Sequence, residues 1–170
     1  VIAGREDVDV DAHGTITIWA GTHVFLGSEM DLNLDQVVAG QVVRLKGATG
    51  VFDAQAGTTT NVIAQDTILE GGEDSIGRED EPIRVDLQPG GTLTARAGID
   101  GHEADVHVVE VNGDLRLDTV YSNRAVTLEA LNGSILDGVD DSMPNIQTVQ
   151  LTLTAAESIG QAGNYLDLDL

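Results

Sequence analysis

The residues best suited to chemistry in this sequence are carboxylates that crowd into turns rich in Gly. One cluster lies between two strand-like segments, and a second follows residues 135–137. Closely spaced carboxylate oxygens are the ligands that Ca²⁺ prefers. Calcium is therefore the ion that these turns would bind, and the candidate ligands are Glu73, Asp74, Glu79, Asp80, Asp137, Asp140 and Asp141. The sequence contains neither an EF-hand loop nor the calcium-binding nonapeptide, so solvated acidic turns are the simpler interpretation.

Two other chemistries have candidate residues. The aspartate pairs 9/11, 140/141 and 167/169 could form a glycosidase or lyase dyad, which needs two carboxylates about 5–9.5 Å apart across a sugar. The chain offers few aromatic or basic residues to line such a groove, and we expect no enzymatic activity. His102, Glu103, Asp105 and His107 lie together in one loop and could approach a zinc site, but an exposed polar loop is the simpler interpretation.

Composition sets limits on the partners. The 170 residues carry a formal net charge of −21, with 29 acidic residues against 8 basic ones. Such a surface repels nucleic acid and anionic lipid, and it favours cations and high ionic strength. The sequence has no Cys, which excludes disulfides and thiolate metal sites. No apolar run reaches the length of a transmembrane helix, so we expect no membrane insertion.

An internal repeat organises these elements. Residues 75–77, 83–87 and 31–37 recur at 158–160, 166–170 and 114–120, each at an offset of 83. Residues 51–53 match 135–137 at an offset of 84, as do residues 23–25 and 107–109, while residues 14–17 match 91–94 at an offset of 77. We therefore divide the chain into a partial repeat 1–13, a repeat 14–90 and a repeat 91–170. The alignment is poorest, and the coil register least defined, over residues 54–66.

The repeat predicts an all-β fold. Segments of three to five residues alternate apolar and polar side chains, with Gly, Asp or Asn between them, which is typical of short strands. We predict a right-handed parallel β-helix (β-solenoid) with about four coils of about 20 residues in each ~83-residue repeat. The alternative is an antiparallel β-sandwich array, which the near absence of aromatic core residues makes less favourable.

Two segments carry a resemblance to a known group of proteins. Residues 126–138 and 151–160 resemble the Thr-, Leu- and Gly-rich repeats of very large bacterial surface proteins of the filamentous-haemagglutinin type. The resemblance implies a parallel β-helix, secretion, and a role in adhesion, biofilm or a surface filament. Its motifs have low information content, and residues 19–21 and 58–65 depart from them.

These observations together give a functional expectation. The chain is predicted to be a structural segment of an extracellular adhesin or filament at the cell surface, with neighbouring repeats or other copies stacked end to end. Surface polysaccharide is a further expected partner, and no cofactor besides Ca²⁺ is expected. The alternative function is a carbohydrate-binding or polysaccharide-degrading β-helix.

Overall fold

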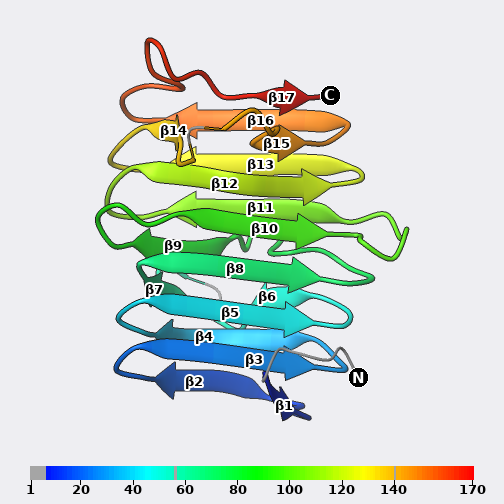
Figure 1. The fold of residues 1–170 in the computed structure, drawn as a ribbon. Coiled ribbons are helices and arrows are strands. Elements are labelled where there is room, and N and C mark those ends of the chain that lie inside the picture. Colours follow the sequence, from blue (N-terminus) through cyan, green and yellow to red (C-terminus); the bar gives the residue numbers. More distant parts are fainter. Residues whose placement is uncertain (1–6, 56, 140) are drawn as a thin grey trace.

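The computed structural model describes residues 7–55, 57–139 and 141–170. Within these ranges the chain forms seventeen β-strands and no helix, as Figure 1 shows. Parallel strands stack into a solenoid of about seven turns, which confirms the predicted parallel β-helix. The front strands run to the right and the rear strands to the left as the chain climbs, so the coil is right-handed (Figure 1). The alternative β-sandwich is therefore wrong.

Two parallel sheets form the long faces of the rod. Sheet A contains β1 (Val8–Val10), β3 (His23–Ser28), β5 (Val42–Gly47), β8 (Asp66–Gly71), β10 (Leu93–Ala97), β12 (Leu115–Ser122), β14 (Ile135–Asp137), β15 (Ile146–Gln147) and β17 (Leu168–Asp169). Sheet B contains β2 (Thr15–Trp19), β4 (Leu32–Val38), β6 (Val51–Asp53), β7 (Val62–Ala64), β9 (Ile83–Leu87), β11 (Asp105–Glu110), β13 (Ala125–Ala130) and β16 (Gln150–Ala155).

The core is a ladder of aliphatic side chains between the sheets. Alternate residues of each strand point inward, as in β9, where Ile83, Val85 and Leu87 are buried and the residues between them are not. Because the strands inside the stack bond to neighbours above and below, stacking satisfies their backbone while each turn adds another apolar rung. The apolar half of the alternation seen in the sequence thus forms the core.

The internal repeat spans an odd number of half-turns, which differs from the predicted four coils. The first unit, from β2 to β9 inclusive, occupies seven successive positions that alternate between the two sheets. Strands β6 and β7 share one of these positions. Each unit therefore makes 3.5 turns, and the prevailing offset of 83 residues corresponds to about 24 residues per turn. As a result β2 lies in sheet B while its equivalent β10 lies in sheet A, and β4 and β12 are exchanged in the same way. Successive units are related by a half rotation about the rod axis.

Strand register shows the repeat at residue level. The pairing of β2 with β4 is irregular between Ile16 and Thr17, and the pairing of β10 with β12 is irregular between Leu93 and Thr94, which lie 77 residues later. The same comparison corrects one alignment. His23 pairs with Val42 and Asp105 pairs with Ala125, so the equivalent of His23 is Asp105 rather than His107. The matching His-Val letters lie two residues out of structural register.

Sheet B is interrupted within residues 54–66, the region whose coil register was least defined by the sequence. Strands β6 and β7 both pair with β4, on its Leu32–Leu34 and Val37–Val38 parts respectively. The segment between them leaves the sheet. One turn higher, Ile76 continues the β6 column through isolated bridges to Val51 and Val106, while β9 continues the β7 column. In the second unit β14 and β15 divide the turn above β12 in the same way.

Candidate functional site

An Asn–Asp pair recurs in both units at the interrupted turns. The Asn61 side chain is buried and donates to the Leu34 and Asp35 carbonyl oxygens and, at 2.8 Å, to Asp53 Oδ1. Its Oδ1 accepts the Arg84 backbone N–H. The pair therefore closes the gap in sheet B where strand pairing is lost.

The second unit repeats this arrangement on the opposite face. Asn145 donates to the Leu117 and Asp118 carbonyl oxygens and, at 2.9 Å, to Asp137 Oδ1, and it accepts the Asp167 N–H. Sequence reasoning missed both asparagines. The signal was available, because each Asn follows its Asp by eight residues.

This network changes the interpretation of Asp137. Its carboxylate is buried and also accepts the Val139 N–H, so it is an internal acceptor and not an open ligand. Asp141 is exposed and its Oδ1 accepts the Met143 N–H. Asp140 lies outside the described residues. The structure thus gives these aspartates different surroundings rather than one shared site.

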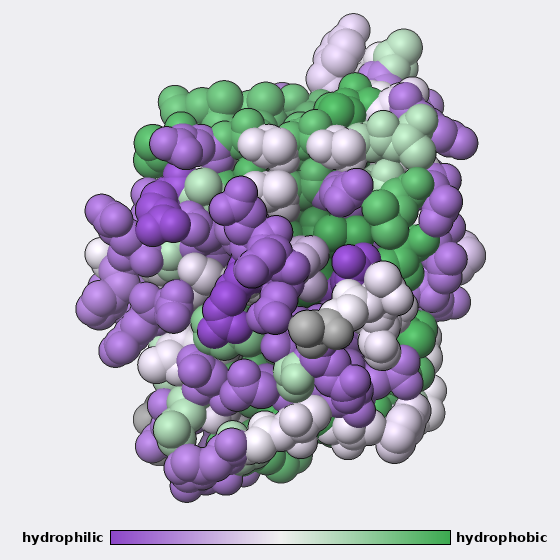
Figure 2. Space-filling model, turned by 180° about the vertical axis from the view of Figure 1, so that it is seen from behind, coloured by the Kyte–Doolittle hydropathy of each residue, from purple (hydrophilic) through white to green (hydrophobic). Residues whose placement is uncertain are grey.

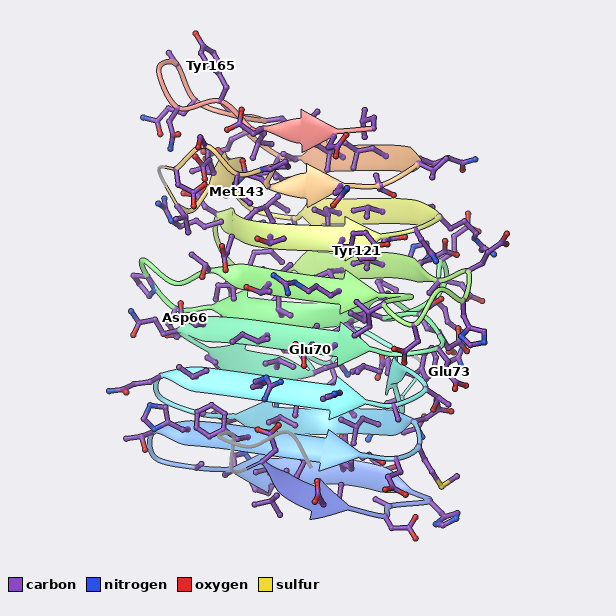
Figure 3. The ribbon with its side chains drawn as sticks, turned by 45° about the vertical axis from the view of Figure 1, so that its right-hand side comes forward. Asp66, Glu70, Glu73, Tyr121, Met143 and Tyr165 are labelled. Carbon is purple, nitrogen blue, oxygen red and sulfur yellow. The ribbon has the colours of Figure 1, made fainter. Side chains whose placement is uncertain are left out.

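The other predicted calcium ligands lie in the segment between β8 and β9. Glu73, Asp74, Glu79 and Asp80 are all exposed, and Asp74 Oδ1 accepts the Ser75 N–H. Figure 3 shows Glu73 beyond the end of β8, at the edge of the rod opposite Asp66. Among the described residues, no three His, Asp or Glu side chains converge as a metal site. Calcium binding remains a prediction without preformed coordination.

The histidine-rich loop does not converge on a metal either. Asp105 is buried and is held by a bidentate ion pair with Arg124, whose Nε donates to Oδ1 at 2.8 Å. His107 Nε2 lies 3.9 Å from Asp105 Oδ2, and the His102 carbonyl accepts the Asn123 side chain. Hydrogen bonding and the charge of Asp105 raise the pKa of Arg124 above its usual value. Asp105 is therefore committed to an ion pair.

A groove of about 590 Å³ lies on the sheet B face above the turn at residues 74–79. Its walls include Arg78, His107, Arg124 and Thr127, together with the ring of Phe52. That ring is buried, and the Arg78 guanidinium covers it at 3.9 Å from the centroid. Sugar-binding grooves use open aromatic faces, and Phe52 offers none.

Glu110 is a third buried carboxylate that, like Asp53 and Asp137, has no ion pair among the described residues. Glu110 in β11 accepts the Leu87 and Asn112 backbone N–H groups, both at 2.9 Å. Burial raises the pKa of Glu110 to about 7, with a smaller contribution from Asp86, against the lowering effect of the two hydrogen bonds. Ser28 occupies the equivalent position in the first unit, where its Oγ accepts the Met30 N–H. Glu110 therefore replaces a neutral turn-capping residue with an ionisable one.

The upper end of the rod presents an unpaired strand edge in the part of the chain that the structure describes. Sheet B ends at β16, whose inward residues Leu151, Leu153 and Ala155 pack on the core but are only partly buried. Figure 2 shows an apolar rim along this end of the molecule. Above the rim, the loop that carries Tyr165 projects from the rod (Figure 3).

Equivalent residues in the first unit show what this end lacks. Ile76 is 0% exposed because Val106 lies directly above it, whereas its equivalent Ile159 is 51% exposed. Leu87 is 9% exposed and its equivalent Leu170 is 71% exposed. The difference arises because another turn covers the first unit.

Comparison with known proteins adds no relative. No protein-family model matches the sequence, and no curated protein or solved structure matches it. Within the described residues, the structure contains no helix long and apolar enough to cross a membrane.

Proposed function

We propose that this chain is a structural segment of an extracellular rod, the shaft of an adhesin or surface filament. The observation that carries the proposal is the repeated unit. Three features recur after 3.5 turns: the register irregularity, the Asn–Asp pair and the interrupted turn. Each unit therefore leaves at its upper end the type of strand edge on which the next unit is built. A fold of this kind extends indefinitely without changing its cross-section.

The surface chemistry supports the same role. A net charge of −21 keeps a long, apolar-cored rod soluble and suits an environment of high ionic strength. The resemblance to filamentous-haemagglutinin-type repeats supports secretion and surface display. The covered ring of Phe52 disfavours the polysaccharide-degrading alternative.

Length scaling tests the shaft role. Chains carrying additional copies of residues 91–170 should lengthen by about 17 Å per copy, since 3.5 turns rise by about 4.8 Å each. Small-angle scattering should show a constant cross-sectional radius. A cross-section that grows with copy number would refute the rod.

Location is tested on intact cells of the source organism. Antibodies raised against the folded chain should label the surface without permeabilisation. Labelling that requires permeabilisation would refute surface display while leaving the scaling result unaffected.

A further inference from the structure

The chain already contains one complete junction between its two units, and that junction specifies how a second copy would join. In the internal junction β10, the first strand of the second unit, pairs with β8 of the first. Thr94 lies opposite Ile68, and Ala95 lies opposite Leu69. The equivalent of β10 is β2, and the equivalent of β8 is β16.

We propose that copies of the chain associate head to tail by pairing the lower edge of β2 in one copy with the upper edge of β16 in another, in the β8–β10 register. This proposal rests on the rod function and names its partner, a second copy. The predicted Cα partners are Ile16 with Leu151, Thr17 with Thr152, Ile18 with Leu153, Trp19 with Thr154 and Ala20 with Ala155. Because each chain holds two units and seven turns, successive copies are related by translation along the rod without the half rotation.

The side chains at this edge favour the match. Within the chain, Leu93 lies over Thr67, whose buried hydroxyl has no hydrogen-bond partner among the described residues. At the junction between copies, Ile16 would lie over Leu151 instead. Ile18, Ala20, Leu151, Leu153 and Ala155 are all partly buried apolar residues already packed against the core. The core-facing side chains at the junction between copies are thus more apolar than those at the internal junction.

Strand β1 adds a second feature. Val8, Asp9 and Val10 pair with Leu26, Gly27 and Ser28 of β3. In the internal junction, β9 pairs with β11 at the equivalent positions, and the equivalent of β9 at the upper end of the chain is β17. Strand β1 therefore occupies the edge of β3 that β17 of a preceding copy would take. Association requires one of these two strands to leave that edge.

Disulfide trapping between full-length chains tests the register. The natural chain has no Cys, so Thr17→Cys and Thr152→Cys variants can be mixed and oxidised without background thiols. Both side chains are exposed, and paired parallel strands place Cα atoms within disulfide range. We expect at least about tenfold more heterodimer than from the control mixture of Thr17→Cys with Thr154→Cys, which is displaced by two residues on the same face. Roughly 0.5 M NaCl screens the acidic surfaces.

Two further arms complete the experiment. A Thr94→Cys/Ile68→Cys chain, which places Cys at the internal pair, should form an intramolecular disulfide and thereby calibrate the yield. Val10→Pro, which weakens β1, should increase the Thr17–Thr152 heterodimer about threefold, because the β3 edge becomes free for β17.

Equal yields from the matched and displaced mixtures, or heterodimer from neither, would overturn the proposal. Failure here together with the expected length scaling would refute the junction but not the shaft role.

Discussion

The upper edge of the first unit and the upper edge of the second have nearly the same structure and different surroundings. Strands β8 and β9 are covered by β10 and β11, whereas β16 and β17 have no strand above them in the described chain. Ile76 and Ile159 make equivalent bridges to the turn below, yet one is buried and the other is half exposed. The comparison shows that the burial of a turn depends on the turn above it, and in a one-dimensional stack we expect stability to depend on that neighbour in the same way.

The sharpest test compares the two Asn–Asp pairs. Asn61→Ala removes three donated hydrogen bonds and leaves the Asp53 carboxylate buried without its side-chain donor, so we expect the free energy of unfolding to fall by about 4 kcal/mol. Asn145→Ala should lower the global value by less than half as much, because the uncovered turns can open locally. Urea unfolding followed by hydrogen exchange measures both effects. Gln55→Ala, at an exposed side chain, is the control, and equal losses at the two asparagines would contradict the comparison.

Truncation of a core side chain tests the same difference between the two edges without changing any charged or polar group. Leu69→Ala should cost about 3 kcal/mol, because Leu69 is fully enclosed between turns. Leu153→Ala, at the equivalent position in β16, should cost less than about 1 kcal/mol, because the side chain is only partly buried and its site can collapse. Chemical denaturation measures both values. A cost at Leu153 as large as that at Leu69 would show that the upper edge is covered in solution.

A third prediction concerns Glu110, which stands where the first unit has Ser28. Its folded pKa of about 7 exceeds its ordinary value of 4.5, so the folded state binds the proton more tightly. The free energy of unfolding should therefore fall as pH rises from about 4.5 to 7 and then level off, with Glu110 contributing on the order of 2 kcal/mol. In Glu110→Gln this part of the fall should disappear.

The control for that prediction is Glu129→Gln, which removes a carboxylate from the outward face of β13. This control separates the effect of Glu110 on the free energy of unfolding from the effect of general repulsion among carboxylates, which also lowers that free energy as pH rises. Identical pH profiles for wild type and Glu110→Gln, measured by urea unfolding from pH 4 to 8, would contradict the assignment.

The smallest expected effect is that of calcium on the acidic turn between β8 and β9. At a Ca²⁺ concentration about ten times the dissociation constant, linkage gives about 1.4 kcal/mol of stabilisation. Thermal melting should show a larger rise with Ca²⁺ than with Mg²⁺ at equal ionic strength, and Glu73→Gln/Asp74→Asn should remove the difference. Identical melting in the two ions would eliminate this turn as a site.

The candidate site was predictable only in part. Asp137 was predicted as a calcium ligand because it lies close in the sequence to Asp140 and Asp141, whereas its burial against Asn145 makes it a structural acceptor. Alternation gives no direction to Asn145, which lies at a gap in the strand pattern, so the recurring spacing of eight residues between Asp and Asn was the available signal.

The rod could be predicted from the amino-acid pattern alone. Period-2 alternation sets which side chains enter the core, the 83-residue offset sets the unit, and glycine at Gly77 and Gly160 is required by backbone φ values of 69° and 74°. The folded chain was needed to show that the unit makes 3.5 turns and that His23 corresponds to Asp105. There are two physical reasons. The number of turns depends on which strands share one position in a sheet, as β6 and β7 do, and the sequence does not show this. Strand register is fixed by hydrogen bonds to a neighbour about 24 residues away, and similar residue letters do not reveal that neighbour.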